Sequence, residues 1–222
     1  MNDEYRRRSP KNVLAELAWL HRRLGITNIA FYDDALLVDA DQHIKPILEG
    51  VLKKELDCWF HTPNGLHTRL VDREVAGLMF RTGFKTVRLS LETADRTISR
   101  RTGPKANRGD LIRALEHLAR AGYRRQQIGV YLMAALPGQT AGEIVESIDF
   151  VIGQGAPVKL ALYSPIPGTS EWRHAVRRGL QEPGADPLLQ NNTVFPASSP
   201  ELPPERLETI KQYVKERNAS LA

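Results

Sequence analysis

Polar and small residues follow the apolar runs of this chain at the points where strands are expected to end. Asp33 and Asp34 follow one run, and Ser90 and Glu92 close another. Carboxylates accept hydrogen bonds from ammonium groups and ribose hydroxyls, and backbone amides in a turn can bind an adenine edge. These residues therefore suit a polar ligand that carries an amine and hydroxyls. The other strand-end positions are Thr62, Pro63, Asn64, residues 134–139 and residues 163–169.

His61 and His67, taken with Asp33 and Asp34, offer a second chemistry, that of a metal-dependent hydrolase built on a barrel. The gap between the two histidines is not a tight metal-ligand spacing, and the other histidines fall in expected helices. We therefore predict no metal site at these residues and keep the hydrolase as an alternative function.

Cys58 is the only cysteine of the chain. An iron–sulfur cluster needs several thiolates, because soft sulfur ligands hold the irons. One cysteine also permits no internal disulfide, which fits a reducing compartment and predicts a cytoplasmic protein. We expect Cys58 to be a small buried core residue and not a ligand.

Composition limits the partners of the protein. The 222 residues are long enough for one sizeable core, and no apolar run reaches the ~20 residues of a membrane span. The net charge is +5 and the pI is about 9.4. The arginine pairs of the chain are scattered along the sequence and have no aromatic residues between them, which argues against a nucleic-acid partner. The pairs are Arg22–Arg23, Arg100–Arg101, Arg124–Arg125 and Arg177–Arg178.

Strand-like runs alternate with capped helices throughout the chain. Ser9 and Pro10 open a helix that Gly25 ends, and Thr140 with Glu143 forms a capping box ahead of another. Apolar residues at helical spacing indicate further helices near residues 44–52, 72–82, 107–121 and 171–179, and around Leu207, Ile210, Tyr213 and Val214. The expected strands are residues 28–32, 57–62, 85–92, 128–133 and 159–163.

This alternation predicts an α/β fold with parallel strands, in a barrel or an open sheet. The array begins with a helix, and there is no room for a strand before Ser9. We place one domain at residues 9–180 and a C-terminal extension with a final helix at residues 181–222. Ligands of such proteins gather at the carboxyl ends of the strands.

Five motifs at these strand ends resemble, in order and spacing, those of radical S-adenosylmethionine (radical SAM) enzymes. They are FYDDALLV from Phe31, FHTPNGLHTR from Phe60, VRLSLET from Val87, VYLMAALPGQT from Val130 and YSPIPGT from Tyr163. The tail DPLLQNNTVFP from Asp186 is similar to that of members often joined to a cobalamin-binding domain.

The resemblance implies a partial (β/α)6 TIM-like barrel whose first strand is missing, and a site for S-adenosylmethionine. In this family a 4Fe–4S cluster binds S-adenosylmethionine and reduces it to a 5′-deoxyadenosyl radical. By position, Asp33 and Asp34 would receive the methionyl amine, and Ser90 and Glu92 would face the ribose or the methionyl carboxylate. The remaining expected contacts are Leu132, Ala134 and Leu136 along the adenine, Tyr163 and Pro165 at the sixth strand, and Asn64 on the substrate side.

The cluster loop CxxxCxxC of the family is absent from the chain. The resemblance therefore implies the carboxyl-terminal part of a radical SAM enzyme, inactive alone, with the cluster supplied by an N-terminal fragment that carries the loop. The resemblance leaves open whether cobalamin is a further cofactor. The alternative is a non-catalytic chain that completes a barrel or binds another protein.

Overall fold

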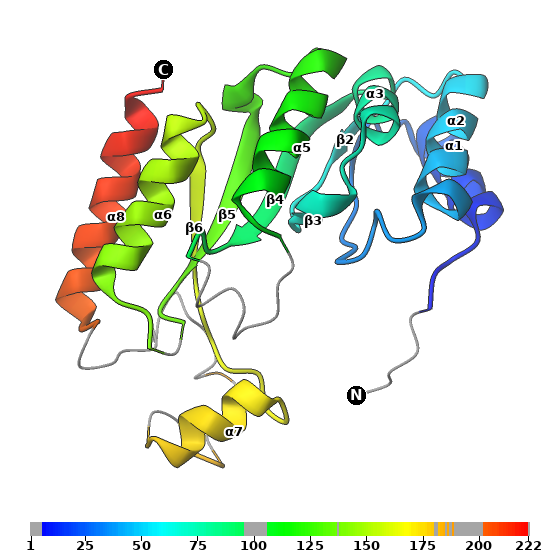
Figure 1. The fold of residues 1–222 in the computed structure, drawn as a ribbon. Helices are drawn as coiled ribbons and strands as arrows, with labels where there is room; N and C mark the ends of the chain where they lie inside the picture. Colours follow the sequence, from blue (N-terminus) through cyan, green and yellow to red (C-terminus); the bar gives the residue numbers. More distant parts are fainter. Residues whose placement is uncertain are drawn as a thin grey trace. The chain divides into compact units, whose positions relative to one another are not determined.

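Helices and strands alternate along the chain in the computed structural model, which describes residues 6–95, 106–136, 138–179, 182–184, 186, 188 and 202–221 (Figure 1). Every strand pairing described is parallel, which confirms the predicted α/β class. The strands are β1 Asn28–Ala30, β2 Trp59–His61, β3 Leu66–His67, β4 Phe84–Glu92, β5 Ile128–Ala134 and β6 Val158–Leu162. The helices are α1 Pro10–Leu24, α2 Ile44–Lys53, α3 Arg73–Arg81, α5 Arg108–Ala121, α6 Ala141–Gly153, α7 Ser170–Arg177 and α8 Pro204–Ala219.

The chain divides into two compact units. The first contains Met1–Ser90 and Arg108–Gly129, and the second contains Leu91–Asn107 and Val130–Ala222. The predicted boundary near residue 180 lies outside the described residues, as does most of the 181–201 stretch.

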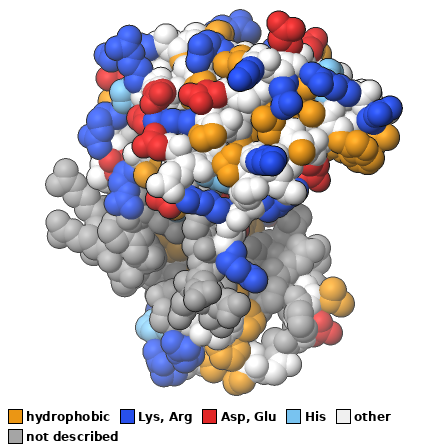
Figure 2. All heavy atoms as spheres, turned by 90° about the vertical axis from the view of Figure 1, so that its right-hand side faces the viewer, with side chains coloured by type: hydrophobic (Ala, Val, Ile, Leu, Met, Phe, Trp, Pro, Cys, Tyr) orange, Lys and Arg blue, Asp and Glu red, His pale blue; other side chains and the backbone are white. Residues whose placement is uncertain are grey.

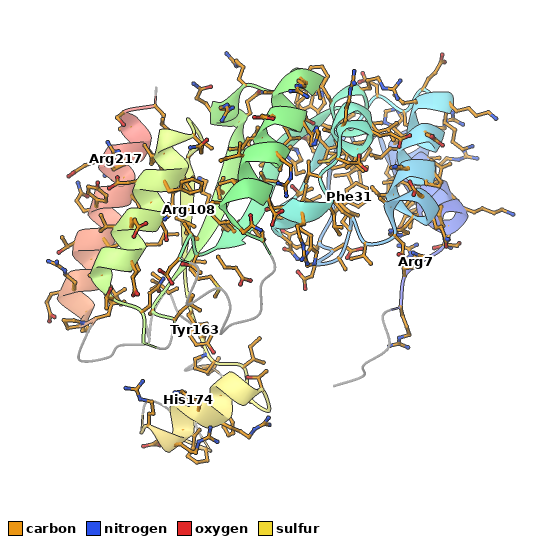
Figure 3. All side chains as sticks on the ribbon, viewed as in Figure 1. Arg7, Phe31, Arg108, Tyr163, His174 and Arg217 are labelled. Atoms are coloured by element: carbon orange, nitrogen blue, oxygen red, sulfur yellow. The ribbon has the colours of Figure 1, made fainter. Side chains whose placement is uncertain are left out.

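In the first unit β1 pairs with β2, and β2 pairs with β4. The short strand β3 pairs with the later part of β4, through Leu66 with Leu89 and His67 with Ser90. The core is built from alternate residues of β4, since Val87 and Leu89 are fully buried. Phe31, which is labelled in Figure 3, follows β1 and stacks on Phe84 with ring centroids 5.9 Å apart.

Local signals explain where the helices of the first unit begin and end. The Ser9 side chain accepts a hydrogen bond from the Asn12 amide, and Gly25 ends α1 with φ of +66°. Asp72 caps α3 in the same way through the amide of Val75. Each cap satisfies a backbone group that a helix end otherwise leaves without a partner. The caps at Ser9 and Gly25 were predicted from the sequence and are confirmed.

In the second unit β5 pairs with β6 over five residues, from Val130 with Val158 to Ala134 with Leu162. Helices α6 and α8 lie side by side next to β6 (Figure 1). The Asn218 side chain bonds both the amide and the carbonyl of Val158, at 2.8 and 2.9 Å. The C-terminal helix is thus tied to β6 by a pair of amide hydrogen bonds.

The structure also corrects some element bounds. Strand β1 ends at Ala30 and not at residue 32, and β2 begins at Trp59 and not at residue 57. Strand β3 was not predicted, because two residues are too few to show an alternating pattern. In the described part of the chain, no strand precedes α1.

No described helix combines the length and the apolar character that crossing a membrane requires. On the face seen in Figure 2, Lys and Arg side chains are interspersed with acidic and hydrophobic ones and do not gather into one basic patch.

Candidate functional site

Two loops of the first unit meet at the carboxyl end of β1. Asp34 follows β1, Asn64 follows β2, and the Asn64 side-chain amide donates a 2.6 Å hydrogen bond to the Asp34 carboxylate. The neighbouring Asp33 accepts a 2.8 Å hydrogen bond from the backbone amide of Ala35, which fixes its carboxylate. Asp34 is exposed and the other two residues are half-buried. The structure therefore brings Asp33, Asp34 and Asn64 together as an acidic, accessible edge.

A polar network crosses β1, β2 and β4 in the same unit. The His61 ring nitrogens lie 2.8 Å from the Thr86 hydroxyl and 3.4 Å from the Asn28 side-chain oxygen. The Thr62 hydroxyl donates to the Thr86 carbonyl and accepts from the amide of Arg88, both at 3.2 Å. The sequence interpretation considered only the strand ends and missed this network. The alternation of polar residues along β4 is the signal that could have revealed it.

Arg88 of β4 passes over Gly129. A Cβ atom at Gly129 would lie 2.8 Å from the Arg88 Cδ atom and 3.0 Å from its Nη1. Glycine at this position therefore makes room for the guanidinium stem on the sheet. Ser90, two residues along β4, is half-buried, and its carbonyl accepts a 2.7 Å hydrogen bond from Thr68. Arg88 and Ser90 place a cation and a hydroxyl on alternate positions of one strand.

Glu92, the last residue of β4, belongs to the second unit and has φ of +64°. This left-handed conformation is costly for a residue with a side chain and often marks functional sites. The backbone around it is fixed, since the Thr93 amide bonds the Leu91 carbonyl at 2.8 Å and the Ala94 amide bonds the buried Ser147 hydroxyl at 3.1 Å. Glu92 is half-buried.

The loop after β5 holds a second strained residue, Ala135, with φ of +66°. Gln139 is buried and closes this turn, accepting a hydrogen bond from the Leu136 amide at 3.2 Å and donating to the Met133 carbonyl at 3.3 Å. These hydrogen bonds tie Gln139 to Leu136 and Met133 at the carboxyl end of β5, which is the end where a ligand is expected.

The predicted adenine contacts on β5 are almost inaccessible. Leu132 is 1% exposed, Ala134 is 0% and Leu136 is 4%. Contact with a ligand through this segment would use backbone atoms, while the half-buried side chains of β5 belong to Tyr131 and Met133. These two residues were not predicted.

Tyr163 follows β6 and is half-buried (Figure 3). Its amide donates a 2.8 Å hydrogen bond to the Ala134 carbonyl, which extends the β5–β6 ladder by one residue. Pro165 is buried. The structure thus joins the predicted β5 and β6 positions at one edge of the second unit.

The residues present do not fit an iron–sulfur cluster. Cys58 is 3% exposed, and burial raises the pKa of its thiol, with the nearby Asp57 as a smaller cause. Among the described residues there is no group of three or more His, Cys, Asp or Glu side chains that could hold a metal ion. His61 contacts a hydroxyl and an amide instead of a carboxylate. The hydrolase interpretation has no support from these contacts.

A pocket of about 600 Å³ adjoins the acidic edge. Asp33 and Asp34 line it together with residues of β1 and α1, the arginines that precede α1, and the buried His43. This volume lies within the usual range for small-molecule and cofactor sites.

Comparison with known proteins identifies relatives of this fold. Residues 1–151 match the profile of the Radical SAM superfamily. No match was found among curated protein sequences.

Solved structures share the fold at low sequence identity. One is the radical S-adenosylmethionine methyltransferase TsrM from Kitasatospora setae with cobalamin and a [4Fe-4S] cluster bound, at TM-score 0.68 and 17% identity over 81% of this chain. The same enzyme with tryptophan and a SAM analogue bound gives TM-score 0.68 and 16% identity over 81% of this chain. HemN from Escherichia coli, a coproporphyrinogen III oxidase, gives TM-score 0.63 and 12% identity over 94% of this chain. The fold of this chain is therefore that of a partial radical SAM barrel.

This chain is much shorter than those structures. The aligned region spans 37% and 36% of the two TsrM chains and 45% of HemN.

Proposed function

Because the chain belongs to the radical SAM superfamily, we propose that it supplies the S-adenosylmethionine-binding part of a radical SAM enzyme. When bound and reductively cleaved, S-adenosylmethionine supplies the 5′-deoxyadenosyl radical on which the chemistry of this superfamily depends. The observation that carries the proposal is the acidic edge, where Asp33 and Asp34 are held at the end of a parallel strand and one of them is bonded to Asn64.

The strand ends of each unit, taken separately, carry groups that match the chemistry of this ligand. Carboxylates of Asp33 and Asp34 are acceptors for a methionyl ammonium, and Ser90 can donate to a carboxylate or ribose oxygen. Glu92 is an acceptor for ribose hydroxyls, and its strained backbone is the kind of feature that accompanies ligand sites. Backbone groups at Ala135 and Leu136, beside the hydrogen bonds of Gln139, are acceptors and donors for a base.

An iron–sulfur cluster needs several thiolate ligands, and the single buried thiol of Cys58 cannot supply them. We propose that the cluster is held by a segment that carries the CxxxCxxC loop and lies outside these 222 residues. This chain by itself would then bind S-adenosylmethionine weakly and cleave none of it. Cobalamin belongs among the ligands to test, since the TsrM structure contains it and residues 186–196 resemble the tail of cobalamin-linked members.

Isothermal calorimetry with S-adenosylmethionine tests the site without requiring turnover. We expect weak binding by the chain, lost in Glu92→Ala and in Asp34→Ala. Glu116→Ala is the matched control, because Glu116 is an exposed carboxylate on α5 away from the strand ends. Unchanged affinity for S-adenosylmethionine in both variants would show that neither Asp34 nor Glu92 contributes to binding.

If calorimetry detects no binding to the intact chain at millimolar ligand, the chain would be better described as a non-catalytic partner that completes a barrel. The same titration with cobalamin then separates a cobalamin-binding protein from one that binds neither ligand.

A further inference from the structure

A second pocket of the first unit, which we call the α2–α3 pocket, has a volume of about 350 Å³. It lies where β2 and β4 begin, beside the C-terminal ends of α2 and α3, two helices that are neighbours (Figure 1). Its floor is apolar, since Val51, Leu56 and Cys58 are each at most 5% exposed. Ligands of parallel α/β proteins gather at the opposite, carboxyl ends of the strands, so the fold by itself does not account for this pocket.

The backbone of β4 departs from regular pairing beside the α2–α3 pocket. Two consecutive residues of β2 are opposite Phe84 and Thr86, so Lys85 is an extra residue in the pairing. Bulges of this kind are rare between parallel strands, and they often redirect a side chain near a functional site. The Lys85 ammonium lies 5.5 Å from the centroid of the Trp59 ring, and both side chains line the pocket.

The turn after α2 carries a second backbone irregularity, at Glu55. Its φ of +51° is the left-handed conformation in which many helices end, and glycine is the usual residue there. Four other helices of this chain, α1, α3, α5 and α6, are each followed by a glycine with positive φ: Gly25, Gly83, Gly122 and Gly155. After α2 the chain has a glutamate instead, although a side chain makes this conformation costly. Such strain often accompanies ligand sites, and Glu55 lines the pocket.

The charged residues of the α2–α3 pocket are two carboxylates and two cations. The carboxylates belong to Glu55 and Asp57, and the cations belong to Arg81 and Lys85. All four residues are exposed, and within the described part of the chain they form no ion pair with one another. Trp59, 51% exposed, adds an aromatic surface. The pocket therefore offers acceptors for an ammonium, donors for a carboxylate and an apolar contact for the rest of a ligand.

We propose that the α2–α3 pocket binds a free α-amino acid with an apolar side chain. The ligand ammonium bonds the carboxylates of Glu55 and Asp57, its carboxylate bonds Arg81 and Lys85, and its side chain packs against Trp59. The inference goes beyond the proposed function, because it concerns the end of the strands opposite the acidic edge and requires no S-adenosylmethionine.

Ligands with charge of one sign fit the α2–α3 pocket less well. A phosphate would be repelled by Glu55 and Asp57, and a metal ion would be repelled by Arg81 and Lys85. A zwitterion gives each pair of charges an opposite partner.

An NMR titration of the full chain with L-phenylalanine tests the proposal. We expect the indole N–H signal of Trp59 to shift with a dissociation constant on the order of 1 mM, as suits a small ligand with few contacts. The signals of Trp19 on α1 and Trp172 on α7 serve as internal controls and should not shift. Phenethylamine lacks the carboxylate and 3-phenylpropanoate lacks the ammonium, so each should bind roughly tenfold more weakly than phenylalanine.

Charge-neutralising variants assign the two ends of the ligand. Arg81→Gln should weaken phenylalanine binding roughly tenfold, and so should the double variant Glu55→Gln/Asp57→Asn. Arg120→Gln and Glu116→Gln are the matched controls, because both residues are exposed on α5, and they should leave the affinity unchanged.

Two results would overturn the proposal. One is the absence of a Trp59 shift at about ten times the expected dissociation constant, or equal affinity in the wild type and in the charge-neutralising variants. The other is loss of phenylalanine binding in Asp34→Ala with no loss in Arg81→Gln, which would place the amino acid at the acidic edge. The proposal does not depend on S-adenosylmethionine, so failure of that ligand to bind leaves this result unaffected.

Discussion

Glu92 combines a candidate ligand role with a strained backbone, and the two can be separated by mutation. Its φ of +64° is a conformation that glycine adopts freely. Glu92→Gly should therefore raise the free energy of unfolding by about 0.5–1 kcal/mol while weakening S-adenosylmethionine binding. Urea denaturation and calorimetry measure the two effects.

Glu55→Gly is the control for that experiment. Glu55 has φ of +51°, is exposed and lies in the loop after α2, away from the strand ends. It should show a similar gain in stability with no change in affinity. A loss of stability in Glu92→Gly would mean that side-chain contacts of Glu92 outweigh its backbone strain.

At the scale of elements, the attachment of α8 to α6 has a titratable hydrogen bond. The Tyr213 hydroxyl donates to Asp149 at 2.7 Å, and Arg217, which is labelled in Figure 3, contacts the same carboxylate at 3.1 Å. The bond to Asp149 raises the pKa of Tyr213, with burial as a smaller cause. Because the pKa of Tyr213 is higher in the folded protein than in the unfolded chain, the hydrogen bond stabilises the fold fully when the pH is below the unfolded pKa of about 10. This stabilisation is lost as the pH rises through the folded pKa.

Tyr213→Phe should accordingly lower the free energy of unfolding by about 1 kcal/mol at neutral pH. It should also make the free energy of unfolding fall less steeply with pH above pH 10. Urea denaturation at pH 8 and above pH 10, with and without the substitution, measures both effects. Glu208→Ala, which removes the surface pair with Lys211, should change little at either pH. Parallel alkaline curves for wild type and Tyr213→Phe would show that the hydroxyl does not hold α8.

Among the described residues, strand β1 has a neighbour on one side only, β2, and this predicts weak protection of its backbone amides. Amides of Asn28 and Ala30 should exchange roughly tenfold or more faster than those of Val87 and Leu89, which lie in the fully buried part of β4. Hydrogen exchange with mass spectrometry or NMR measures the difference in a monomeric sample. Equal, strong protection would mean that another part of the chain covers β1.

For the whole molecule, the lone thiol limits the cofactor content. After anaerobic reconstitution with iron and sulfide, we expect no stoichiometric 4Fe–4S cluster and no cleavage of S-adenosylmethionine. The iron content and visible absorbance after desalting should be the same in Cys58→Ala, because the thiol is buried and its pKa is raised. A cluster that survives desalting in the wild type and disappears in Cys58→Ala would contradict this.

The sequence by itself determined the elements whose signals are local. The caps at Ser9 and Thr140 lie within a few residues of the groups they bond, so they could be predicted and are confirmed. The parallel α/β class followed from the alternation of helices and strands, and the absence of a cysteine-rich loop followed from composition. The family itself followed from motifs at the strand ends.

The tertiary structure alone decided which of these residues meet. The bond between Asp34 and Asn64 joins loops far apart in the chain, and it depends on the register of β1 against β2. The left-handed backbone at Glu92 and Ala135, neither of them glycine, is imposed by surrounding contacts and has no sequence signal. The same holds for the pocket lined by α1 and β1: the apolar stripe of α1 is visible in the sequence, and only the packing of the helix on α2 leaves much of that stripe uncovered by the described residues.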